Sequence, residues 1–233
     1  MARLKSNSSQ KAFEELKNRI NCFDLLPGDT VSDINLSKEL EMSRTPIREA
    51  FQKLIQYNLV EKQRTKFVVK NVTINDITEI LEAREAIEIQ ASKTIISNKK
   101  LTSELLIELR NIQKQIETAN NINDMKSGFN LDSLFHKKII EFTDNSRLIE
   151  IMNNLSIQGE RYRWISLLNP QSNEKTKEEH FQIIRSLELR DLNMLDISIN
   201  NHLETAKKNY SNILLNQDWL NILISFKLMF KNK

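Results

Sequence analysis

Glycine and proline are scarce in this chain, with three of each among 233 residues. Sheets and tight turns consume those two residue types, so their scarcity favours a structure built from helices. Apolar residues recur at helical spacing through most of the chain, and we expect helices over residues 9–20, 33–41, 43–54, 74–97, 102–119, 127–143, 146–168, 173–189, 191–215 and 218–230. Two β-prone runs, 59–63 and 67–71, are expected to form one hairpin. The predicted fold class is therefore mainly α.

The predicted elements fall into two domains. Residues 1–72 hold a helix, a short turn, a second helix and the hairpin, which is the order of a winged helix-turn-helix. Residues 73–233 contain only predicted helices and are numerous enough to bury a core of their own, so we expect an all-helical bundle. The tail, residues 217–233, is expected to pack on that bundle or across a dimer interface.

The sequence SRTPIREAFQKL at residues 43–54 indicates a recognition helix. Its apolar members share the 3, 4, 7 spacing of a buried stripe and are Ile47, Ala50, Phe51 and Leu54. Ser43 is expected to cap the helix. A first turn that carries Arg44, Thr45 and Arg48 suits a DNA major groove, where Arg reads guanine and Thr reaches a phosphate or a thymine methyl.

Positive charge gathers on the same segment. The net charge of the chain is +3, but residues 43–70 hold seven Lys or Arg against two Asp or Glu, a local excess typical of a phosphate-facing surface. The residues expected to contact DNA are Ser43, Arg44, Thr45, Arg48, Lys53, Arg64 and Lys66. The hairpin turn at residues 64–66 has no glycine, and we expect a wider loop there.

All three histidines of the chain lie in the predicted bundle. Asp132 and His136 are four residues apart and so share one helix face, while His180 and His202 belong to two later helices. Three imidazoles and a carboxylate form a ligand set for Zn²⁺, Ni²⁺ or a similar divalent ion. Spacing alone does not show that the helices converge, so isolated histidines without a metal remain an equal interpretation.

The chain resembles the GntR regulators, in the FadR-type branch with a helical FCD effector domain. The DNA-binding matches are LPGD at 26–29, LSKEL at 36–40, SRTPIREA at 43–50 and LV at 59–60. The effector-domain matches are Arg84, Glu88 and Ala91, DSLFH at 132–136, NSRL at 145–148, EH at 179–180, Asp191 and HL at 202–203. One departure is Asn58, which stands where the family has glycine, although Asn tolerates a left-handed backbone.

This resemblance implies a ligand-responsive transcriptional regulator that binds operator DNA as a homodimer. It assigns Asp132, His136, His180 and His202 to a divalent metal, Zn²⁺ or Ni²⁺, with open positions for a small carboxylate effector. Arg84 is a candidate to bind that carboxylate, with an i, i+4 ion pair to Glu88 as the equal alternative. Arg161 is a weaker effector-binding candidate, for which a solvated helix face is the alternative.

Other classes fit the sequence less well. The single cysteine, the lack of a signal peptide and the lack of an apolar run long enough to span a bilayer predict a cytoplasmic protein. A metal sensor, with the ion itself as effector, is the alternative function. A metalloenzyme would leave the DNA-binding motif unexplained, and no base stands beside the ligand set, so we expect no enzyme.

Overall fold

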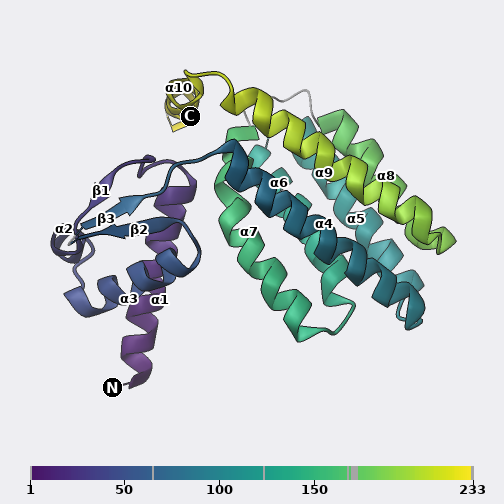
Figure 1. Cartoon of the computed structure of the whole chain (residues 1–233), viewed down its shortest axis with the longest axis horizontal. Coiled ribbons are helices and arrows are strands. Elements are labelled where there is room, and N and C mark those ends of the chain that lie inside the picture. Colours follow the sequence, from purple (N-terminus) through teal and green to yellow (C-terminus); the bar gives the residue numbers. More distant parts are fainter. Residues whose placement is uncertain (1, 65, 123, 167, 169–172, 232–233) are drawn as a thin grey trace. The chain divides into compact units, whose positions relative to one another are not determined.

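The computed structural model describes residues 2–64, 66–122, 124–166, 168 and 173–231 (Figure 1). The chain forms two compact units. The first comprises Met1–Thr73 with Glu160–Trp164, and the second comprises Ile74–Gly159 with Ile165–Lys233. No helix in the described ranges is long and apolar enough to cross a membrane.

The first unit is a winged helix-turn-helix, as predicted. Its elements are α1 (Ala2–Asn21), β1 (Thr30–Val31), α2 (Asp33–Glu39), α3 (Arg44–Gln56), β2 (Val60–Gln63) and β3 (Lys66–Val69). The three strands form an antiparallel sheet in the order β1-β3-β2. The sequence did not predict β1, because two residues are too short to show a strand period.

Helix α3 is fixed by its apolar stripe. Ile47, Ala50, Phe51 and Leu54 are all buried, as their spacing predicts. Phe51 stacks on Phe67 of β3 with ring centroids 3.9 Å apart, which ties the recognition helix to the wing. Ser43 occupies the N-cap position, but its side chain makes no capping hydrogen bond.

Left-handed residues close the turns of this unit. Asn58 has φ +57°, so it supplies the conformation that glycine would supply, as expected. Arg64 has φ +55°, and the strand register pairs Gln63 with Lys66. The loop is therefore only two residues long, and the expectation of a wider wing loop was wrong.

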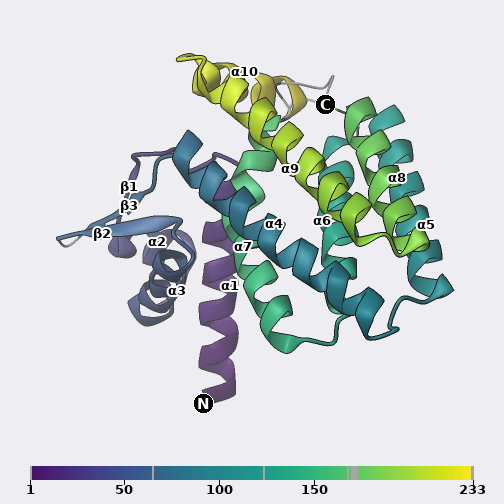
Figure 2. The ribbon, with the colours of Figure 1, turned by 45° about the vertical axis from the view of Figure 1, so that its right-hand side comes forward.

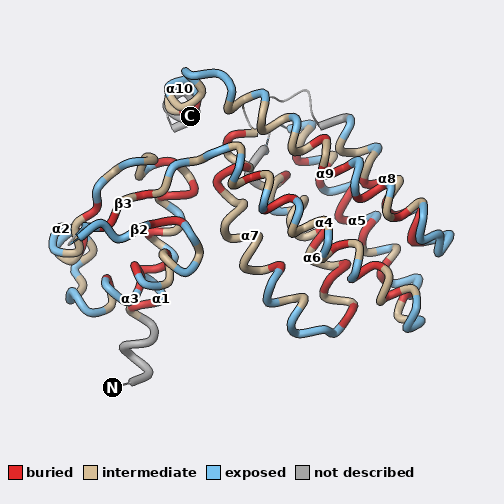
Figure 3. The backbone as a smooth tube through the Cα atoms, viewed as in Figure 1, coloured by how far each residue is buried: buried red, intermediate tan, exposed pale blue. Residues whose placement is uncertain are grey.

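The second unit is all helical. It contains α4 (Ile74–Ser97), α5 (Ser103–Asn121), α6 (Met125–Glu141), most of α7 (Ser146–Ser166), α8 (Asn173–Leu189), α9 (Leu192–Leu214) and α10 (Trp219–Lys231). Helix α9 runs beside α4 and α8, and α5 packs against α6 and α8 (Figure 2). Buried residues line the inward sides of these helices (Figure 3). A cluster of buried polar side chains lies within this apolar interior where α4, α5, α6, α8 and α9 meet.

Candidate functional sites

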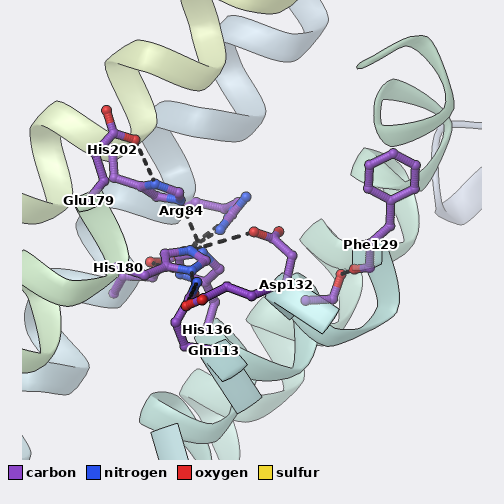
Figure 4. Close-up of polar contacts among 11 residues, drawn as sticks. Arg84, Gln113, Phe129, Asp132, His136, Glu179, His180 and His202 are labelled. Carbon is purple, nitrogen blue, oxygen red and sulfur yellow. Dashed lines mark hydrogen bonds and ion pairs between the residues drawn. The ribbon is translucent and has the colours of Figure 1, made fainter. Parts of the chain in front are cut away.

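The four predicted metal ligands come together inside the bundle. Asp132 and His136 project from α6, His180 from α8 and His202 from α9 (Figure 4). One ligand atom from each lies within 4.8 Å of the others. The three histidines are buried and Asp132 is partly exposed. The fold thus supplies the convergence that spacing along the chain could not show.

Each histidine is oriented by an oxygen atom from another helix. The distances from Nδ1 are 2.8 Å for His136 to Glu88 Oε2, 2.7 Å for His180 to Gln113 Oε1 and 3.2 Å for His202 to Glu179 Oε2. Carboxylate and amide oxygens accept hydrogen bonds, so each ring donates from Nδ1. The Nε2 lone pairs are then left for the centre of the cluster, which is the arrangement of metal-binding histidines.

The three Nε2 atoms at the centre of the cluster are placed to bind a cation. His136 Nε2 lies 3.1 Å from His202 Nε2, and with Nδ1 of each ring turned to a carboxylate, both Nε2 atoms face the same point. A metal ion at that point can be bound by both nitrogens. His180 Nε2 is buried without a hydrogen-bond partner and lies 3.5 Å from Asp132 Oδ1. The three imidazoles and one carboxylate therefore fit a divalent ion such as Zn²⁺ or Ni²⁺.

Burial and charge prepare these groups for a metal. Burial raises the pKa of Asp132, but the neighbouring histidines and Arg84 outweigh it and bring that pKa down to about 2. The pKa of Glu88 is likewise well below its ordinary value, because His136 and Arg84 outweigh its burial. Burial lowers the pKa of both His136 and His180. At neutral pH the carboxylates are charged and these two rings are neutral, which is the form that binds metal.

The sequence did not assign to this site the three residues that orient the histidines, Glu88, Gln113 and Glu179. Glu88 continues the buried stripe of α4, and Gln113 continues that of α5. Glu179 also holds the hydroxyl of Thr205, which donates to its Oε1 at 2.6 Å. Glu88 and Gln113 could have been identified from the sequence, because each is a polar residue within an otherwise apolar helical stripe. A buried polar side chain needs a hydrogen-bond partner.

The two arginines proposed for effector binding have other contacts. Arg84 donates from Nε and Nη2 to Glu88 Oε1 at 3.0 and 2.8 Å, which is the i, i+4 ion pair given as its alternative. Arg161 is only 3% exposed, so a solvated helix face was wrong for it. Its Nη1 donates to the Lys70 carbonyl at 2.8 Å within the first unit, and it is not a member of the histidine cluster.

The predicted DNA-contacting residues lie on or next to the recognition helix and on the wing. Ser43, Arg44, Thr45, Arg48, Arg64 and Lys66 are exposed. Lys53 instead donates to Gln10 Oε1 on α1 at 2.8 Å. A cavity of about 400 Å³ between α3 and the wing is lined by Arg48, Gln52, Lys62, Arg64 and Phe67, three of them basic. Lys62 was not singled out from the sequence.

One feature of this surface differs from the expectation. Arg44 and Arg48 were expected to be free for nucleic acid, but both are paired with Asp33. Arg44 Nη2 lies 2.9 Å and Arg48 Nε 3.0 Å from Asp33 Oδ2. Both guanidinium groups remain accessible, with 52% and 64% of their side chains exposed.

These observations define a class of protein: a winged helix-turn-helix DNA-binding protein with a helical domain built around a polar cluster. Residues 8–69 match the bacterial regulatory proteins of the gntR family, and residues 79–205 match the FCD domain. The FCD match spans more than half of the chain. The chain therefore belongs to the GntR family of bacterial regulators with an FCD domain, and it is a DNA-binding transcriptional regulator.

Relatives of known role are similar over most of their length. The chain is 25% identical to the HTH-type transcriptional repressor RspR of Escherichia coli (strain K12) over 203 residues, covering 86% of this chain and 87% of RspR. It is 25% identical to the gluconate operon transcriptional repressor of Bacillus licheniformis over 214 residues, covering 88% and 86%. The solved structure of E. coli McbR/YncC shares the fold, with a TM-score of 0.73 at 22% identity over 88% of this chain and 97% of that one. By name, these relatives are transcriptional repressors or regulators.

Proposed function

We propose that this regulator binds operator DNA as a homodimer and that its helical domain holds a divalent metal ion, Zn²⁺ or Ni²⁺, at Asp132, His136, His180 and His202. A small carboxylate is the proposed effector. The observation that carries the metal assignment is the 3.1 Å approach of His136 Nε2 to His202 Nε2 while each Nδ1 faces a carboxylate. A metal ion between the rings would bind both lone pairs and so stabilise this arrangement.

The exposure of the cluster supports an effector that approaches from the Asp132 side. The Asp132 side chain is 28% exposed, whereas that of His180 is 0% exposed. When bound, the metal supplies a Lewis-acid position that a carboxylate oxygen can occupy. Arg84 holds Glu88, which in turn orients His136, so we assign Arg84 to positioning the site. The name of one relative, the gluconate operon repressor, concerns a sugar acid and agrees with this chemical class.

A metal sensor, in which the ion itself is the effector, is the second candidate. The burial of the cluster favours it, because His136 and His180 are 0% exposed and a bare ion is smaller than any organic ligand. The two candidates differ in one respect: a sensor responds to the ion alone.

On the DNA side, we propose that Arg44, Thr45 and Arg48 read bases while Arg64, Lys62 and Lys66 bind phosphates. Arg and Thr at the start of a recognition helix suit base edges and thymine methyl groups. The exposed cations of the wing suit the backbone, whose contacts position a protein without carrying sequence information. A two-fold dimer would present two such surfaces to two half-sites.

The test is a thermal-shift screen of small carboxylic acids with Zn²⁺, with Ni²⁺ and with a chelator. We expect each metal to raise the melting temperature, and one class of acid to raise it further only when metal is present, since ligands of the native state stabilise it by mass action. His202→Ala should abolish both shifts. The active acid should then change the affinity for a selected DNA duplex; a change with metal alone would establish the sensor instead. No shift with any divalent metal would refute the metal centre.

A further inference from the structure

The carboxylate of Asp33 joins the two arginines of the recognition helix. Its single atom Oδ2 lies 2.9 Å from Arg44 Nη2 and 3.0 Å from Arg48 Nε. Asp33 is the first residue of α2, so the contact crosses the turn between the two helices of the helix-turn-helix. The Asp33 side chain is 12% exposed, whereas both arginines are more than half exposed. The anchor is thus largely buried and the groups it holds face solvent.

The atoms used in this contact matter for DNA recognition. The ion pair of Arg48 with Asp33 runs from Nε, at 3.0 Å from Oδ2, so the carboxylate lies on the Nε side of the guanidinium and the two terminal nitrogens point further from it. Those two nitrogens form the parallel fork that binds guanine O6 and N7. A guanidinium held at Nε is therefore fixed in direction while its base-reading end stays available.

We propose that Asp33 is a specificity-determining residue that positions Arg48 for base readout and holds Arg44 beside it through one terminal nitrogen. The proposal rests on the proposed reading of bases by these arginines. An unrestrained Arg side chain can bind any phosphate within reach. An Arg that is already held in its DNA-bound conformation loses less conformational entropy when it binds the correct base. The negative charge of Asp33 also repels a phosphate group close to the guanidinium nitrogens, so binding of these arginines to the DNA backbone is disfavoured. Two guanidinium groups and one carboxylate leave a net positive charge, so the surface still attracts DNA.

A purely structural role for Asp33 is the alternative. An acidic residue in the first turn of a helix interacts favourably with the helix dipole. However, Ser32 already caps α2, since its hydroxyl accepts a hydrogen bond from the Asn35 N–H. The two roles predict different results, because loss of helix stability weakens all DNA binding and loss of positioning weakens only discrimination.

The experiment begins with the wild-type chain, which selects its preferred sequence from a pool of duplexes with a random core. Fluorescence anisotropy then gives the Kd for the selected duplex and for a scrambled duplex of equal length. The variants are Asp33→Asn, Asp33→Glu, Arg48→Ala as the reference for lost readout, and Glu49→Gln as the matched control. Glu49 is exposed on α3, and its replacement makes the same charge change as Asp33→Asn.

We expect Asp33→Asn to lower the ratio of selected to scrambled affinity about tenfold, while binding to the scrambled duplex becomes tighter and the melting temperature stays unchanged. Asp33→Glu should keep most of the ratio, because it retains the carboxylate. Glu49→Gln should tighten binding to both duplexes equally.

Three outcomes would overturn the proposal. They are a wild-type ratio in Asp33→Asn, a parallel loss of affinity for both duplexes with a lower melting temperature, and a loss in Asp33→Glu as large as that in Asp33→Asn. If the wild-type chain enriches no sequence, both the proposed operator binding and the proposed role of Asp33 are wrong. If it enriches a sequence and Asp33→Asn keeps the wild-type ratio of selected to scrambled affinity, only the role of Asp33 is wrong.

Discussion

The chemistry of single residues decides what the bundle interior can hold. Gln113 is 1% exposed, and its Oε1 accepts the Nδ1–H of His180 at 2.7 Å. The other two histidines face carboxylates, so His180 is the one ring with a neutral orienting partner. It is also the ring whose Nε2 has no hydrogen-bond partner. Gln113 is therefore the residue that fixes the direction of the His180 Nδ1–H.

Replacing Gln113 by Leu should weaken metal binding about 10- to 100-fold, the usual effect of removing an outer hydrogen bond from a metal-binding histidine. The ring would lose both its fixed tautomer and its fixed direction. Isothermal titration with Zn²⁺ measures the change. Gln115→Leu is the matched control, because Gln115 is exposed on the same helix. Equal affinities for the two variants would show that His180 is not a ligand held in this way.

At the scale of elements, the scarcity of glycine also affects the ends of the helices, because residues other than glycine must adopt the left-handed conformation there. Non-glycine residues adopt positive φ just beyond six helices: Phe23, Glu41, Asn58, Lys99, Asp144 and Arg190. Helices commonly end in this left-handed conformation, and glycine adopts it at the least cost. Only Asn58 and Asp144 are of the types that enter this region readily. Phe23 is buried in the core, so of the other four only the exposed positions Glu41, Lys99 and Arg190 are sites where stability can be gained without loss of packing.

Lys99→Gly should raise the free energy of unfolding of the helical unit by about 1 kcal/mol, because Lys99 has φ +54° and an exposed side chain. Urea denaturation followed by circular dichroism measures this. Lys99→Ala keeps the Cβ atom and is the control, for which no comparable gain is expected. A destabilised glycine variant would mean that the entropy it adds to the unfolded chain outweighs the strain it removes.

At the scale of the whole molecule, the order and approximate bounds of the helices could be predicted from the sequence, whereas the contacts between helices could not. Helices over residues 74–97 and 173–189 were predicted to the residue, because long apolar periods define them. The convergence of His136, His180 and His202 was beyond sequence spacing, since it depends on how α6, α8 and α9 pack. The Asp33 pairing was missed for the same reason: a contact across a turn between two helices leaves no period in the sequence.

Acid should destabilise the helical unit in the absence of metal. The direction of this pH dependence follows from the shifted pKa values of four groups. The pKa values of His136 and His180 lie below the ordinary value of 6.5, and those of Glu88 and Asp132 lie below 4.5 and 3.8. The unfolded chain therefore binds protons more readily than the folded one, and stability falls as pH falls. The histidine part of the loss begins near pH 6.5, and the carboxylate part follows as pH drops through about 4 towards 2.

Melting temperatures measured with a chelator from pH 8 to pH 5 should thus be level above about pH 7 and decline below it. Added Zn²⁺ should raise the melting temperature at pH 7, and this increment should shrink towards pH 5, since protons and metal compete for the same imidazole nitrogens. A His180→Gln variant loses one of the buried rings, so its chelated form should decline less steeply between pH 7 and pH 5. A chelated wild type that is most stable at pH 5 would contradict the neutral, buried state of these histidines.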